Sequence, residues 1–191
     1  MTSASSTTDA ILEDQILQRV ASISLARNLY RRDFLLRFRL ESEGNKVFGR
    51  IAIEYDLVNG SGTRQPYTQE ITIDDCERGY VEAMSVMVDG KPVYQLRNPP
   101  ITEHCRGFVA YRGPTLQIEP SAKGKLYRGT ARWVIKRNEN DFWYLHAGIP
   151  TFGVNVETMA PAGFDITPSF SAPRLYLTSE HVDITWKRNA M

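Results

Sequence analysis

From Asp33 onward the apolar residues recur at every second position in short runs, which is the period of a strand buried on one face. The first run places Phe34, Leu36, Phe38 and Leu40 on one side. Turn-forming sequences such as Asn-Gly and Asp-Gly separate such runs every roughly 8–12 residues along the chain. We therefore expect residues 33–191 to form an all-β domain, an antiparallel β-sandwich or barrel of about 10–11 strands.

The stretch before this domain has a helical period instead. Residues 1–8 are small and hydroxylated, so we expect a flexible tail, and residues 9–32 read as one N-terminal amphipathic helix. Its apolar stripe consists of Leu12, Ile16, Val20 and Ile23. Such a stripe must be covered. It packs on a sheet of its own domain, or it mediates association, as the seam of a homo-oligomer or with a protein partner; a membrane surface is the third option.

Composition excludes several classes of protein. With 191 residues the chain has the length of one domain, and its net charge of +1 gives no reason to expect nucleic-acid binding. No apolar run approaches the roughly 18 residues of a membrane span, and no secretory signal is visible. Cys76 and Cys105 are too few for a disulfide framework, so we expect a reduced, cytoplasmic protein. A single bridge between these two cysteines stays open.

No catalytic motif is present. The sequence lacks a G-x-S-x-G nucleophile elbow, a phosphate-binding glycine loop and any C-x-x-C or H-x-x-x-H pair. The acidic loop around Asp74 is typical of a solvated loop, because no further carboxylates surround it at calcium-binding spacing. The neighbours His104 and Cys105 would point to opposite faces of a strand. We therefore expect no enzyme activity, no cofactor and no metal site.

The segment from Lys125 to Ala160 concentrates arginines and aromatic residues. Tyr127–Lys136 and Phe142–His146 read as two strands of a hairpin. Because successive side chains of a strand point to opposite faces, the first strand has a core face and an opposite, basic face. The core face carries Tyr127, Ala131, Trp133 and Ile135, and the basic face carries Arg128, Arg132 and Lys136.

Two uses of that basic face remain open. With Trp143 from the return strand, Arg128, Arg132 and Lys136 could bind a small anionic ligand by hydrogen bonds and ring stacking. The arginines could equally make ordinary cross-strand pairs with Glu54 and Asp56, or with the acidic residues of the turn.

Several phrases of the sequence resemble a known family. They are LYRRDF, IEYDLVNGSGTRQPY, MSVMVDGKPV and GIPTFGVNVETMAPAGFDITPSF. The chain is similar to the β-rich soluble domains of bacterial proteins associated with nucleotide-signalling antiphage defence systems. This resemblance implies a role in antiphage defence and supplies no catalytic residues.

Three functions are compatible with these patterns. The first is a non-enzymatic binding, sensing or protein-interaction module. The second is a shell or scaffold subunit that assembles through the helix and a sheet edge. The third is a lipocalin-like carrier of a small ligand.

Overall fold

The computed structural model describes residues 29–44, 46–74, 79–146, 149–170, 176–177 and 181–189. In these ranges the chain forms sixteen β-strands and one 3-10 turn, Ser121–Lys123, so the all-β prediction is confirmed and the strand count is higher than expected. The tail, the predicted helix up to residue 28 and its apolar stripe lie outside the described residues. Residues 29–32 are not the end of a helix, because they pair with β2 as the beginning of the first strand.

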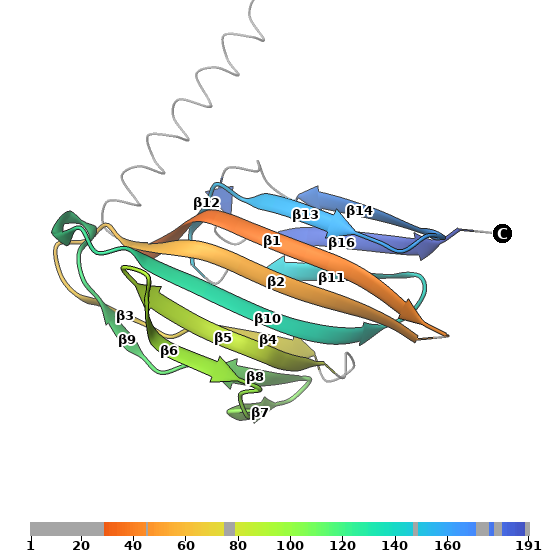
Figure 1. The fold of residues 1–191 in the computed structure, drawn as a ribbon, viewed down its shortest axis with the longest axis horizontal. Helices are drawn as coiled ribbons and strands as arrows, with labels where there is room; N and C mark the ends of the chain where they lie inside the picture. Colours follow the sequence, from red (N-terminus) through yellow and green to blue (C-terminus); the bar gives the residue numbers. More distant parts are fainter. Residues whose placement is uncertain are drawn as a thin grey trace, which may run out of the picture.

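An eight-stranded sheet forms one layer of the described part (Figure 1). Seven of its strands follow one another in the order β15 (Tyr176–Leu177), β12 (Thr151–Phe152), β1 (Leu29–Glu43), β2 (Lys46–Asn59), β10 (Tyr127–Arg137), β5 (Tyr80–Val88) and β6 (Lys91–Arg97). The eighth, β13 (Asn155–Met159), continues alongside β1 after β12. We call this the large sheet.

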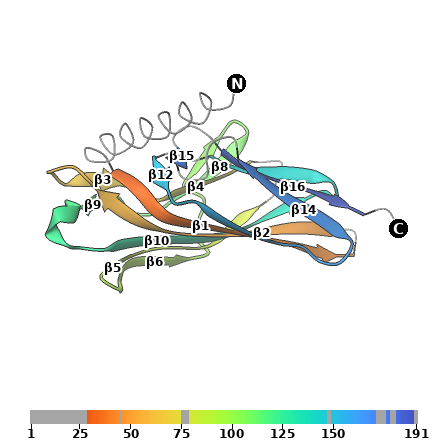
Figure 2. The ribbon, with the colours of Figure 1, turned by 90° about the horizontal axis from the view of Figure 1, so that it is seen from above.

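Three smaller sheets lie behind the large sheet (Figures 1 and 2). One has the order β11 (Asp141–His146), β16 (His181–Arg188) and β14 (Phe164–Phe170). Another has the order β4 (Glu70–Asp74), β8 (Phe108–Arg112) and β7 (Glu103–Cys105), and the last pairs β3 (Gln65–Tyr67) with β9 (Leu116–Ile118). The large sheet is open, ending at β15 and β6, so the domain is a sandwich.

Aromatic side chains hold the two layers together. Phe38 of β1 lies 5.4 Å from the ring of Trp186 and 5.7 Å from that of Trp143, and both tryptophans belong to the opposite layer. Trp133 of β10 lies 6.0 Å from Trp143. Rings of this size bury large areas in tilted pairs. The alternating positions of β1 and β10 therefore form the core, as their parity predicts.

The predicted hairpin between Tyr127–Lys136 and Phe142–His146 is wrong. The strand β10 pairs with β2 and β5, whereas β11 pairs with β16 in the other layer. Each of the two strands has an apolar face, and these faces meet through Trp133 and Trp143 instead of lying side by side. The turn after β10 thus connects the two layers.

One further expectation needs correction. The domain is not purely antiparallel, since β1 pairs with β12 and β13 in parallel. The segment around Tyr67 and Ile71 divides into β3 and β4, which join two different small sheets. One of the expected Asp-Gly turns joins β5 and β6 into a hairpin. Its turn residues Asp89 and Gly90 have φ values of 50° and 76°, as a two-residue hairpin turn requires.

Within the described ranges, no helix has both the length and the hydrophobicity that crossing a bilayer demands.

Candidate functional site

The outer face of the large sheet, away from the second layer, carries the predicted basic residues of β10. Arg128 donates from Nε to Asp56 Oδ1 over 3.0 Å and lies 3.5 Å from Glu54 Oε1. The hydrogen bond to Asp56 is the main cause that raises the pKa of Arg128 above its ordinary value. Arg128 is therefore used in the cross-strand pairs that were the alternative reading of this face.

Arg132 has different surroundings. It is exposed, and its cross-strand neighbours are Ala52 of β2 and Ala83 of β5. Because both neighbours are alanines, no carboxylate lies directly opposite Arg132 on these two strands. Lys136 lies four residues further along β10, on the same face, and lines a groove.

Trp143 does not share a surface with these basic residues. It is 5% exposed and lies between the layers, on a strand of the opposite sheet. The predicted grouping of Trp143 with Arg128, Arg132 and Lys136 is therefore wrong, because it assumed that β10 and β11 are neighbours in one sheet.

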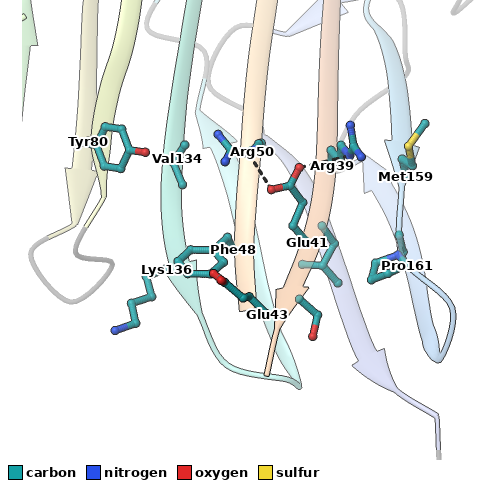
Figure 3. Close-up of a pocket in the computed structure, with 13 residues that line it drawn as sticks. Arg39, Glu41, Glu43, Phe48, Arg50, Tyr80, Val134, Lys136, Met159 and Pro161 are labelled. Atoms are coloured by element: carbon teal, nitrogen blue, oxygen red, sulfur yellow. Dashed lines mark hydrogen bonds and ion pairs between the residues drawn. The ribbon is translucent and has the colours of Figure 1, made fainter. Parts of the chain in front are cut away.

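The groove that Lys136 lines has a volume of about 670 Å³ and runs across the outer face (Figure 3). One row of cross-strand partners forms its middle: Tyr80 of β5, Val134 of β10, Arg50 of β2, Arg39 of β1 and Met159 of β13. Five neighbouring strands contribute to this row, so its ends lie about 19 Å apart at the usual spacing of strands. We call these five residues the outer row.

Ion pairs fix the polar part of the groove. Arg50 donates from Nε to Glu41 Oε2 over 2.6 Å and from Nη1 to Glu82 Oε1 over 2.8 Å. Glu41 also lies 3.4 Å from Nε of Arg39, so one carboxylate joins both arginines of the outer row. The hydrogen bond to Glu41 is the main cause that raises the pKa of Arg50. The guanidinium and both carboxylates are thereby oriented before a ligand arrives.

Apolar side chains flank this polar centre. Tyr80 is 50% exposed and Met159 is 60% exposed, and Figure 3 shows them on opposite sides of Arg50 and Glu41. Val134 is buried next to Tyr80, and Phe48 is half-buried in the floor. The groove thus offers hydrogen-bonding groups in its middle and exposed apolar surface at both ends.

The sequence interpretation missed most of this groove. Arg50 lies on the face opposite the apolar residues of β2, as the alternation along that strand predicts. Nothing in the sequence pattern brings Tyr80 or Met159 to the same row, because β5 and β13 reach it only through their pairing with β10 and β1.

In the part of the chain that the structure describes, no group of three or more His, Cys, Asp or Glu side chains could hold a metal ion.

No protein-family model and no curated protein match the chain. Among solved structures, it is similar to a candidate nutrient-binding protein from Legionella pneumophila, with 9% identity and a TM-score of 0.44 over 85% of this chain and 68% of that one. It is also similar to a family 35 carbohydrate-binding module from an environmental isolate, with 9% identity and a TM-score of 0.26 over 80% of this chain and 78% of that one. At these values, function is inferred from the residues of the groove alone.

Proposed function

We propose that the chain is a non-enzymatic binding module whose outer-face groove takes an extended polyhydroxylated ligand, of the class of oligosaccharides. The observation that carries this proposal is the outer row. In this row Arg50 and Arg39, each ion-paired with Glu41, lie between the exposed side chains of Tyr80 and Met159.

The chemistry of a saccharide fits such a row. Its hydroxyl groups donate to carboxylate oxygens and accept from guanidinium N–H groups, and Glu41 and Arg50 present both side by side. Its C–H faces pack on an aromatic ring, for which Tyr80 is exposed. Because the charged groups already compensate one another, the groove favours a neutral polar ligand over a strongly charged one. Because the outer row spans five strands, it favours a ligand longer than one sugar ring.

The absence of catalytic motifs from the sequence supports a module without enzyme activity. A role in antiphage defence stays a prediction of the family resemblance. Assembly as a shell subunit through the β6 edge is less favoured, because that edge carries Lys91, Pro92 and Arg97, which oppose strand-to-strand association.

A panel of oligosaccharides, screened on an array and measured by calorimetry, tests the proposal. We expect Tyr80→Ala and Arg50→Ala each to weaken binding by about tenfold or more, which corresponds to ~1.4 kcal/mol. Matched controls are Phe142→Ala, which removes an exposed ring of the other layer, and Arg97→Ala, which removes an exposed arginine of β6. The proposal is wrong if no saccharide binds, or if the controls lose as much affinity as the groove variants.

A further inference from the structure

A second cavity lies on the opposite side of the large sheet, between the layers. The strand β4 ends one small sheet and β11 ends another, and residues of both line a cleft of about 640 Å³. The large sheet supplies its floor with Ile53 and Trp133, and β11 supplies Trp143 and Leu145. Figure 1 shows the two small sheets as separate units behind the large one. The cleft has the size of small-molecule sites, and its walls combine apolar side chains with polar ones.

Three charged side chains line this cleft, Arg31 of β1 and the carboxylates Glu70 and Asp74 of β4, so Arg31 is its one cation within the described residues. Its guanidinium lies 4.7 Å from the ring centre of Tyr55, and it also contacts the hydroxyl groups of Tyr55 and Tyr67. Its Nε is buried and donates to no acceptor within the described residues. Arg31 also makes no ion pair with a carboxylate in those ranges.

Tyr55 does not supply the missing negative charge. Burial, and next the neighbouring Tyr67, raise the pKa of Tyr55 well above its ordinary value, so its phenol stays neutral. The ring of Tyr55 offsets part of the cost of burying the cation. A half-buried cation without a paired anion, whose buried Nε N–H lacks an acceptor, is nevertheless costly.

Carboxylates at the rim of the cleft are not partners of Arg31 either. Glu70 accepts a hydrogen bond of 2.6 Å from Arg112, and Asp74 is exposed at the other end of β4. The anion that would complete the environment of Arg31 therefore has to come from outside the described residues.

The position of Arg31 defines the shape of a ligand. In the large sheet Arg31 pairs with Leu57 of β2, whereas Trp133 pairs with Ile51, six residues away along that strand. The cation thus lies at one end of the cleft, with an apolar floor extending from it and the apolar side chains of β11 along one wall. Leu29 and Ile149 add further apolar surface to the lining.

We propose that the interlayer cleft binds an amphipathic anion, with a carboxylate or phosphate head on Arg31 and an elongated apolar body over Ile53 toward Trp133 and Trp143. Both head groups share the chemistry that a guanidinium recognises. This site is separate from the outer-face groove and does not depend on the function proposed for it.

The probes are decanoate, decyl phosphate, 1-decanol and inorganic phosphate, titrated into the full chain and followed by calorimetry and tryptophan fluorescence. We expect both decyl anions to bind at least about tenfold more tightly than 1-decanol, since the head group meets the half-buried guanidinium of Arg31. Inorganic phosphate alone should bind weakly and leave the fluorescence unchanged. Comparing decanoate with decyl phosphate tells which head group the site prefers. Equal affinity for decanol and decanoate, or no binding of any decyl probe, would overturn the proposal.

Variants locate the site. Arg31→Met should abolish the preference for anions, whereas Arg132→Met, an exposed arginine on the other face, should keep it. Leu145→Trp fills the apolar end without touching Arg31 and should block all decyl probes, which tests the cleft even if Arg31→Met does not fold. If Arg132→Met loses the preference too, or Leu145→Trp binds normally, the assignment is wrong. Oligosaccharide binding should be unchanged in Arg31→Met, and decanoate binding unchanged in Tyr80→Ala, so the two proposals fail independently.

Discussion

Arg132 and Trp133 are neighbours in the chain, yet their side chains lie on opposite faces of β10. The indole of Trp133 is 3% exposed and packs against Trp143 of the other layer, whereas Arg132 is exposed between two alanines. Parity alone predicts this division, because successive side chains of a strand point to opposite faces.

We expect Trp133→Ala to lower the free energy of unfolding by about 3–5 kcal/mol, since it removes a large buried ring and leaves a cavity. Arg132→Ala should change it by no more than about 0.5 kcal/mol. Urea denaturation of both variants and the wild type measures the difference. Similar losses in the two variants would contradict the assignment of Trp133 to the core.

Glu119 shows how a single carboxylate depends on its neighbours. Its side chain accepts hydrogen bonds from Arg64 over 2.6 Å and from Lys123 over 2.9 Å. These two partners, Arg64 first, lower its pKa from 4.5 to about 2. The ionised form is therefore favoured by folding.

This shift predicts a pH dependence of stability. Because the pKa is lower in the folded than in the unfolded chain, the contribution of Glu119 is complete above pH 4.5 and is lost as the pH falls toward about 2. We expect Glu119→Gln to melt at a lower temperature than the wild type at pH 7, with the gap closing as the pH falls from 4.5 to about 2. Glu43→Gln, at an exposed glutamate, is the control. A gap that stays constant with pH would show that Glu119 acts by packing instead.

At the scale of elements, the contact between β10 and β2 requires a glycine. Gly129 lies opposite Tyr55, and a Cβ there would come within 2.6 Å of the Tyr55 hydroxyl oxygen. That hydroxyl is engaged with Tyr67 at 2.5 Å and with Gln69 at 3.0 Å. An added methyl group must therefore displace a buried, hydrogen-bonded ring.

We expect Gly129→Ala to cost about 1–3 kcal/mol of stability by overpacking. Gly62→Ala is the matched control, because a Cβ at Gly62 meets nothing within 4 Å. Thermal and urea melts of both variants test the difference. If the two are equally stable, Tyr55 has room to move and the close fit at Gly129 is not required.

Which element pairs with which was the harder prediction. The hairpin of β5 and β6 could be predicted, because Asp89-Gly90 has the local turn chemistry. The separation of β10 from β11, and the parallel pairing of β13 with β1, could not. Alternation shows that a strand has an apolar face. The same alternation is found whether the next strand lies beside it in one sheet or faces it across the core from the other layer.

The candidate sites follow the same division. The outward direction of Arg128, Arg132 and Lys136 was predictable from β10 alone. Asp56 as a partner of Arg128 was one of the two predicted alternatives, whereas nothing in the spacing indicated that Tyr80 reaches the groove from β5. Arg31 was assigned to a helix, and its burial over Tyr55 depends on three strands of two layers.

At the scale of the whole molecule, the large sheet separates two surfaces of different chemistry. Its outer face is covered with ion pairs around an exposed groove, and its inner face meets the second layer through rings. A buried chain of hydrogen bonds, from Tyr94 of β6 through Gln69 to Tyr55 and Tyr67, joins the layers where they are not held by rings. The groove and the interlayer cleft therefore lie on opposite faces of one sheet.

The sequence by itself determined that the domain is all-β, which face of β1 and β10 is buried, and where the β5–β6 turn falls. These properties depend on side chains within a few residues of one another, so local periodicity records them. Only the tertiary structure decided that β10 and β11 belong to different layers, that five strands align the outer row, and that Arg31 lines a cleft without a carboxylate partner in the described residues. Those properties depend on the register between distant strands and on how two apolar faces meet, and neither is recorded in the spacing along the chain.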